Sequence, residues 1–325
     1  MIQIFLKRKR IFEHINKNKN TLMDKKNKLN YFQWRLGDRY DGWRLRNVDP
    51  MFSVAPFILK SRVDSQVLFE IKVPIDNIQS FIRTHKEDIP DLSIMHVVMA
   101  SLVRLMSQRP NLNRFVMWHK IFARNHVNFS IAIKRSMSDI GEETIIKPYF
   151  LPTDTLLDIV RKTNIELTNT LKESHDNSTD NLSKIFGYLP DFLLRSVVFL
   201  FTHFDKVGLM PKAFNHASPF HASFFLTNLG SIGIESIYHH LYNFGTCSMF
   251  VAMGKKTKEN VIDKNGEVKI QKSILLKFVL DERICDGFYY ARSMRLLEKI
   301  LSEPDELLIP PKEVLIDEGV EKKKN

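Results

Sequence analysis

The chain has 325 residues, of which 44% are hydrophobic, and a formal net charge of +11. This length and composition predict a globular protein with a sizeable core and exclude a disordered or fibrous chain. The charge is concentrated in residues 1–30, where nine lysines and arginines outnumber two carboxylates and contribute +7. The rest of the chain therefore carries only +4, and this small excess argues against nucleic-acid binding.

Several classes of protein are excluded by short stretches of the sequence. The two cysteines, Cys247 and Cys285, cannot build a disulfide framework. The first residues, MIQIF, lead directly into KRKR, so we expect no cleavable signal peptide. The most apolar run, 192–204, contains Arg195 and is shorter than the ~20 residues that cross a bilayer. We expect a cytoplasmic protein.

Residues 1–30 are rich in lysine and asparagine, which predicts a basic, flexible extension. We expect one domain over 31–316 and a charged tail over 317–325. Within the domain, the run VLFEIKV (67–73) alternates in polarity and predicts a half-exposed strand that Pro74 ends. The apolar run 92–108 predicts a helix with Ser93 as its N-cap and a stop at Arg109-Pro110.

The middle of the chain predicts further strands and helices. The runs FVMWHKIFARN and VNFSIAIK read as strands, and IIKPYF is followed by a helical pattern in DTLLDIVRKTNIELTN. Residues 181–215 are dense in Phe and Leu, and Pro190 and Pro211 divide them into two apolar helices. This segment is either ordinary core or oligomer contact, or it is a cap that covers a substrate channel or touches membrane lipid.

A strand is predicted at FHASFFLTNLGSIG, residues 220–233. Because side chains alternate along a strand, His221, Ser223 and Thr227 would share one face. The adjacent pair His239 and His240 would point in different directions and has no obvious third partner, so we expect surface or interface histidines and no metal site.

The run ILLKFVLDERICDG, residues 274–287, predicts a buried strand that hands over to a helix. The intervening loop brings Glu282 and Asp286 close to Arg283. The simplest interpretation is a capped loop in which Asp286-Gly287 makes the turn.

The same loop resembles the signature His-x-x-x-Asp-Gly of the chloramphenicol acetyltransferase-like superfamily, which includes the catalytic cores of dihydrolipoamide acyltransferases. Asp281, Arg283, Asp286 and Gly287 fit the signature, whereas Glu282 stands where the family has its histidine. The run TNLGSIG resembles the family's Ser-Asn-Leu-Gly segment, with Thr227 in place of the serine. The resemblance implies an α/β fold, an α+β two-layer sandwich, with an apolar helical insertion.

The resemblance also implies acyl transfer between a CoA or carrier thioester and a thiol or hydroxyl acceptor. A base deprotonates the acceptor, and a hydroxyl stabilises the oxyanion. The residues that this implies are catalytic Glu282, Asp286 and Thr227 and, along the substrate channel, Asn228, Arg283 and Gly287. The alternation along the strand adds Ser223 and His221 to the channel, if Thr227 points into it. No bound cofactor is expected, and the family's active sites imply a homotrimer.

Two alternatives stay open. A carboxylate is a weaker base than an imidazole, so the chain could be a catalytically reduced homologue that serves in binding or assembly. Alternatively, the chain could be a basic peripheral protein that binds anionic lipid or nucleic acid through residues 1–30.

Overall fold

The computed structural model describes residues 29–134, 143–172, 186–263 and 265–321. Its centre is a mixed eight-stranded sheet in the order β10-β11-β9-β8-β5-β6, with β2 also paired to β11 and β7 to β5. The strands are β2 (Gln66–Pro74), β5 (Val127–Lys134), β6 (Glu143–Ile146), β7 (Tyr149–Phe150), β8 (Phe224–Asn228), β9 (Met249–Met253), β10 (Thr257–Ile262) and β11 (Val268–Asp281).

Strand β8 lies in the middle of this sheet, parallel to both of its neighbours. Its Leu226 is level with Ile131 of β5 and Val251 of β9, and all three side chains are buried. Such continuous burial is typical of parallel strands that are covered on both faces. The strand that carries Thr227 is therefore held rigidly on both sides.

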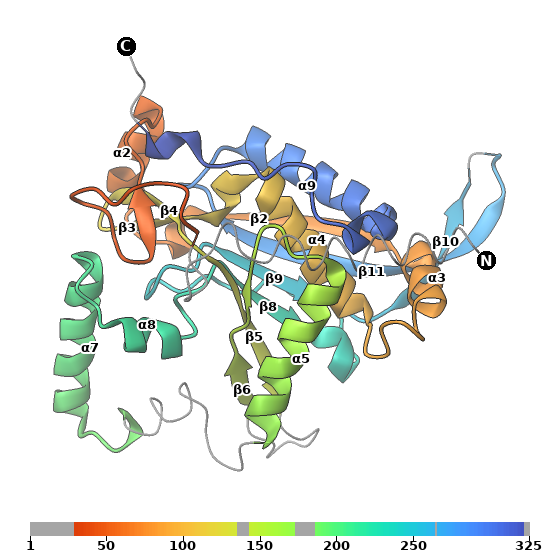
Figure 1. Ribbon diagram of the computed structural model, residues 1–325, viewed down its shortest axis with the longest axis horizontal. Helices are drawn as coiled ribbons and strands as arrows, with labels where there is room; N and C mark the ends of the chain where they lie inside the picture. Colours follow the sequence, from red (N-terminus) through yellow and green to blue (C-terminus); the bar gives the residue numbers. More distant parts are fainter. Residues whose placement is uncertain (1–28, 135–142, 173–185, 264, 322–325) are drawn as a thin grey trace.

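Four helices cover one face of the sheet (Figure 1), namely α3 (Asp76–Thr84), α4 (Ile94–Gln108), α5 (Leu156–Lys172) and α9 (Gly287–Ser302). Helix α4 lies between α5 and α9 and is almost wholly buried. As the sequence predicts, Ser93 caps it by accepting a hydrogen bond from the amide of His96. The predicted two-layer α/β fold is confirmed.

A second, three-stranded sheet in the order β1-β4-β3 packs with α2 (Pro50–Ile58). Its strands are β1 (Gly42–Arg44), β3 (Arg114–Met117) and β4 (Lys120–Arg124). The run FVMWHKIFARN is thus a hairpin and not one strand. Its turn places Trp118 and His119 at φ of 45° and 62°, a left-handed conformation that these residue types seldom adopt and that the sequence did not signal.

The domain boundaries differ from the expected ones at both ends. Leu29 is buried in the core, and its amide donates to the carbonyl of Asn125. The domain therefore includes the end of the expected extension, whose residues 1–28 lie outside the described part. At the other end Asp317 and Val320 are buried, and Arg114 binds the Asp317 carboxylate with two nitrogens. The prediction of a charged tail at 317–325 is wrong for residues 317–320, because this segment packs against the domain.

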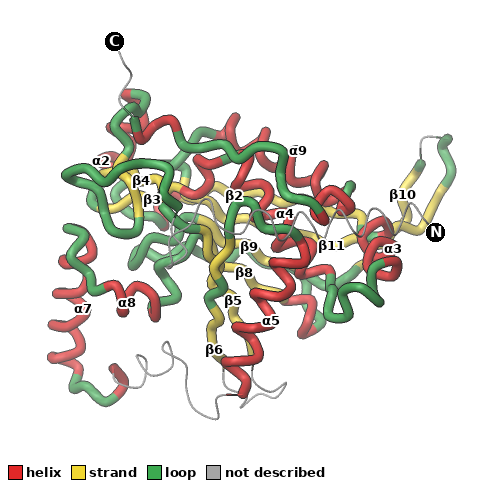
Figure 2. Tube along the Cα trace, viewed as in Figure 1, coloured by secondary structure: helices red, strands yellow, loops and turns green. Residues whose placement is uncertain are grey.

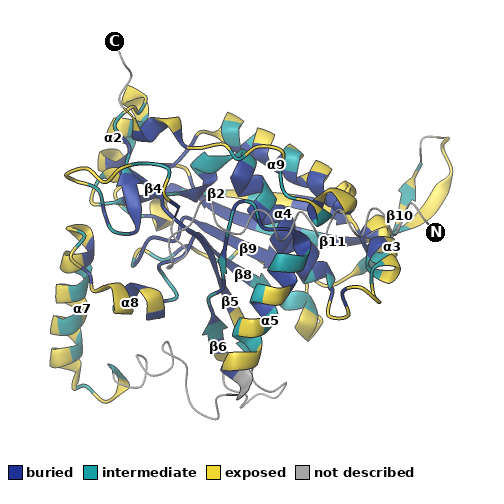
Figure 3. Ribbon diagram, viewed as in Figure 1, coloured by how far each residue is buried: buried dark blue, intermediate teal, exposed yellow. Residues whose placement is uncertain are grey.

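The apolar segment forms α7 (Asp191–Lys206) and the short α8 (Lys212–Ala217), which stand away from the sheet (Figures 1 and 2). Residues 181–185 of the predicted insertion lie outside the described part. Figure 3 shows α7 largely exposed, in contrast to the buried sheet. No helix among the described residues has the length and apolar content of a membrane span. Single-turn 3₁₀ helices complete the fold at Val63–Ser65, Pro110–Asn113, Leu229–Ile232, Pro304–Leu308 and Glu318–Val320.

Candidate active site

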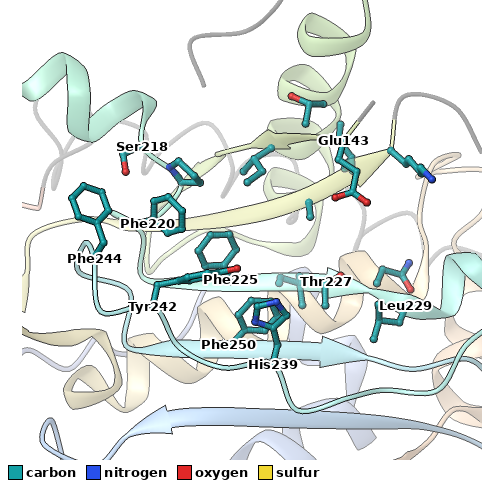
Figure 4. Close-up of a pocket in the computed structure, with 18 of the residues that line it drawn as sticks. Glu143, Ser218, Phe220, Phe225, Thr227, Leu229, His239, Tyr242, Phe244 and Phe250 are labelled. Atoms are coloured by element: carbon teal, nitrogen blue, oxygen red, sulfur yellow. The ribbon is translucent and has the colours of Figure 1, made fainter. Parts of the chain in front are cut away.

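A large, mostly apolar pocket lies beside the carboxyl end of β8 (Figure 4). Its volume is about 1000 Å³, which is the size of a cavity for a small organic ligand. The Phe225 and Phe250 rings, stacked with centroids 5.4 Å apart, form part of the wall. Such a lining favours an apolar ligand over a polar one.

Thr227 and Asn228 bring polar groups to this pocket from the last two positions of β8. Both are half-buried, and the Asn228 amide contacts the Met95 sulfur at 3.8 Å. Gly230 then turns the chain so closely past Gly254 that a Cβ would lie 2.8 Å from its carbonyl oxygen. The glycine of the Asn-Leu-Gly run is therefore required by packing, and it fixes where β8 ends.

A second pocket, of about 860 Å³, adjoins the first and is basic. Arg83, Lys256 and Lys272 line it, and these residues come from three separate segments of the chain. The two pockets share Asn228 and two further lining residues, Met95 and Ser231. The end of β8 therefore lies between an apolar chamber and one whose cations suit phosphate groups.

A buried ion pair joins the end of β11 to the loop that follows it. The Asp281 carboxylate, fully buried, accepts from Arg283 Nε at 2.8 Å and Nη2 at 2.7 Å. A second guanidinium, that of Arg62, has its Nε 3.5 Å from the same carboxylate and donates to the Tyr242 carbonyl at 2.6 Å. Arg283 is thus an internal support of the loop and does not border the apolar pocket.

Glu282 and Asp286, the two carboxylates of the loop, are exposed and lie outside the set of residues that line the apolar pocket. The Glu282 amide donates to the Ser65 carbonyl at 2.9 Å, which fixes its backbone. Asp286 caps α9 by accepting from the Tyr289 amide at 2.6 Å, and Gly287 is the first residue of that helix. Within one chain these residues are not brought to Thr227.

His221 and Ser223 do not share the pocket with Thr227, because β8 begins only at Phe224. The Ser223 hydroxyl accepts from the Asn128 amide at 3.2 Å, and His221 is buried against other polar groups. A histidine does line the pocket, but it is His239, which stacks on Phe250 with centroids 4.1 Å apart. The expectation of two surface histidines holds for His240, which is exposed, and not for His239.

Helix α7 reaches the apolar pocket from outside. Val198 and Phe201 line it, together with Phe214 of α8. Other side chains of α7 face away, and Phe192 and Phe199 are 68% and 60% exposed. The segment therefore closes one side of the pocket and leaves an apolar surface free. No cluster of His, Cys, Asp or Glu suited to a metal ion occurs among the described residues.

Comparison with known proteins connects this site to a family. Residues 217–309 match the model of the 2-oxoacid dehydrogenases acyltransferase family, catalytic domain. The resemblance to this family is confirmed. The segment of this chain that matches the family model contains Thr227, Asn228 and the whole loop from Asp281 to Gly287. No curated protein matches the chain.

The fold is similar to that of a dihydrolipoamide acetyltransferase. Dihydrolipoamide acetyltransferase (E2p) of Azotobacter vinelandii is 13% identical with a TM-score of 0.52, over 81% of this chain and 94% of that chain. A probable dihydrolipoamide acetyltransferase of Listeria monocytogenes 4b F2365 gives 14% and 0.49, over 80% and 95%. A chloramphenicol acetyltransferase gives 8% and 0.48, over 79% and 99%.

Proposed function

We propose that this chain transfers an acyl group between a CoA or carrier thioester and a thiol or hydroxyl acceptor. The observation that carries the proposal is the position of Thr227 in the apolar pocket, next to Asn228, which also lines the basic one. The acyl group occupies the apolar pocket, and the phosphates of a CoA thioester lie against Lys256 and Lys272. The Thr227 hydroxyl donates to the oxyanion that forms when the acceptor attacks the thioester carbonyl.

The base in this proposal is Glu282 of a neighbouring subunit. Within one chain Glu282 is exposed and lies outside the pocket lining, so a homotrimer with shared active sites is needed to bring it to Thr227. In the Azotobacter vinelandii enzyme a serine, a histidine and an asparagine were investigated for their role in the catalytic mechanism, and the last two are four residues apart. Glu282 and Asp286 have the same spacing in this chain.

Replacing Thr227 by valine is expected to lower kcat for acyl transfer about 10²–10³-fold, because the variant keeps the shape and loses one oxyanion donor. The KM for the thioester should not change, since the hydroxyl acts in the transition state. Thiol release from acyl-CoA substrates of increasing chain length measures both constants. Thr84→Val, on the exposed end of α3, is the matched control and should behave as the wild type. An equal loss in both variants would contradict the proposal.

Replacing Lys256 and Lys272 together by glutamine is expected to raise the KM for acyl-CoA, because two cations facing the phosphates are lost. The effect should shrink as salt is added, since these exposed charges are screened. A short acyl-pantetheine thioester, which lacks the nucleotide phosphates, should react equally well with the wild type and with the double variant. Lys299→Gln on α9 controls for net charge alone. A parallel rise in KM for the short thioester would exclude phosphate binding at this pocket.

A second candidate function is that of a catalytically reduced binding or assembly protein. It is favoured by the engagement of Asp286 as a helix cap and by the position of Glu282 outside its own pocket. The exposed apolar side of α7 supports a contact with a protein partner or with lipid. Both cysteines are unpaired and buried, which suits the reducing cytoplasm. A wild type without turnover on any acyl-CoA, thiol or hydroxyl would select this function.

A further inference from the structure

A serine, a histidine and an aspartate form a connected chain of hydrogen bonds near the end of the apolar segment. Ser218 follows α8 and begins a tight turn in which the His221 amide donates to its carbonyl. The Ser218 hydroxyl lies 2.7 Å from His221 Nδ1. On the other side of the ring, Nε2 lies 3.0 Å from Asp205 Oδ2, near the end of α7. Both distances lie within the reach expected between a nucleophile, its base and the group that orients the base.

The neighbouring groups determine where the protons lie in this series of hydrogen bonds. Arg39 donates to Asp205 Oδ1 at 2.7 Å, and although burial opposes ionisation, His221 and Arg39 lower the pKa of the Asp205 carboxyl below its ordinary value. A carboxylate only accepts, so His221 carries its proton on Nε2. Burial lowers the pKa of His221, against the pull of Asp205, which keeps the ring neutral. Its Nδ1 lone pair therefore accepts from the Ser218 hydroxyl.

The serine faces the same large apolar pocket as Thr227. Ser218 belongs to the pocket lining beside Phe220 and Phe244 (Figure 4). Figure 4 shows Ser218 and Thr227 toward different ends of this pocket. Ser218 is only 1% exposed to solvent, so bulk water is held away from its hydroxyl. A nucleophile in this position is available to a ligand that enters the pocket.

We propose that Ser218, His221 and Asp205 act as a nucleophile, a base and an orienting carboxylate toward the thioester or ester of an apolar acyl group. The proposal rests on the pocket and on these three side chains, and it requires neither Thr227 nor a shared active site. The triad would provide a second, covalent route beside the transfer described above. In this route the acyl group is released to water or to an acceptor. Triads of this kind are recognised by geometry and roles and not by the order of the residues in the chain.

The reaction divides into two balanced steps. Ser218 Oγ attacks the carbonyl carbon while its proton passes to His221 Nδ1, and the new C–O bond replaces the C–S or C–O bond of the substrate. The leaving thiolate or alkoxide takes the proton from Nδ1. Water or an acceptor hydroxyl then attacks the acyl-serine, gives its proton to Nδ1, and frees the Ser218 hydroxyl as that proton returns. Asp205 stabilises the charged ring in both steps.

The arrangement uses the two nitrogens of the ring in the opposite sense from the serine protease triad, where Nε2 faces the serine and Nδ1 the aspartate. The chemistry is unaffected, because the two nitrogens share one conjugated ring and either can take a proton when the other carries one. What the reversal changes is the direction from which the substrate must approach. Here the approach is from the Phe220 and Phe244 side of the turn.

The test is covalent labelling of the intact protein with a fluorophosphonate that carries an alkyl chain, followed by mass spectrometry of the peptides. We expect label on Ser218 in the wild type, complete loss of label in Ser218→Ala, and at least a tenfold slower reaction in His221→Gln. Ser196→Ala is the matched control, because Ser196 lies on α7 outside the pocket lining and its hydroxyl is bound to the Phe192 carbonyl. This control should be labelled like the wild type.

The wild-type result alone can overturn the proposal, whatever the folding of the variants. An unlabelled wild type, or label on another residue, would do so. Hydrolysis of p-nitrophenyl esters with acyl chains of different length should be lost in Ser218→Ala and retained in Thr227→Val. If Thr227→Val and Glu282→Gln leave acyl transfer intact while Ser218 is labelled, the roles proposed above for Thr227 and Glu282 fail and the triad stands. Equal ester hydrolysis by the wild type and Ser218→Ala would reject the triad.

Discussion

Replacing Asp281 by asparagine is expected to destabilise the protein by about 3–5 kcal/mol, the cost of removing one partner from a buried ion pair. The side chain keeps its shape but loses its charge, so Arg62 and Arg283 remain buried without their counter-ion. Burial lowers the pKa of Arg62, and the Asp281 carboxylate opposes this effect. The urea midpoint should fall while the slope of the transition stays the same.

Glu282→Gln is the matched control for this prediction. Glu282 is the next residue in the chain and carries the same type of carboxylate, but it is exposed. Surface substitutions of this kind change stability by no more than about 0.5 kcal/mol. If Asp281→Asn unfolds at the same urea concentration as Glu282→Gln, the ion pair does not hold the loop, and the position of the whole DERICDG run must be explained by β11 and α9 alone.

Glu282→Gln is expected to have its effect on the rate. If Glu282 is the base for acyl transfer, its replacement should lower kcat about 10²–10⁴-fold, the usual contribution of general base catalysis. Thioester binding should change little, because proton transfer takes place in the transition state. Acyl-CoA turnover with a thiol acceptor measures the loss, and urea unfolding shows that the variant is folded.

Light scattering tests the shared site on which this expectation depends. A trimer at micromolar concentration agrees with a Glu282 that reaches Thr227 of a neighbour, and a monomer removes that mechanism. Unchanged turnover in Glu282→Gln would point to another base in the pocket. His239 is the residue to replace next, since it lines the pocket that contains Thr227.

Local sequence patterns predicted the main elements of this fold. The alternation in 67–73 became β2, the N-cap at Ser93 begins α4, and the apolar run before Asp281 became the buried end of β11. These predictions succeed because hydrophobic period and capping act between residues a few positions apart. The same holds for Asp286, whose side chain caps the helix that follows it.

The sequence misplaced residues whose positions depend on distant partners. Period two placed His221 and Ser223 beside Thr227, but the regular strand starts at Phe224, and Ser223 is bound to Asn128 of β5. Arg283 was assigned to the channel, yet its guanidinium binds Asp281 at the end of β11 and also donates to the carbonyl of Leu59, which is far away in the chain.

The sequence by itself determined the family signature, the two layers of the fold and the strand that carries Thr227. Only the tertiary structure decided what surrounds that strand. The basic pocket joins α3 to the β10–β11 hairpin through Arg83, Lys256 and Lys272, and the triad joins the end of α7 to the turn at Ser218. Such groupings cannot be recognised from periodic patterns in the sequence. They depend on which buried surfaces meet after the elements have formed, and a local pattern carries no information about contacts between distant segments.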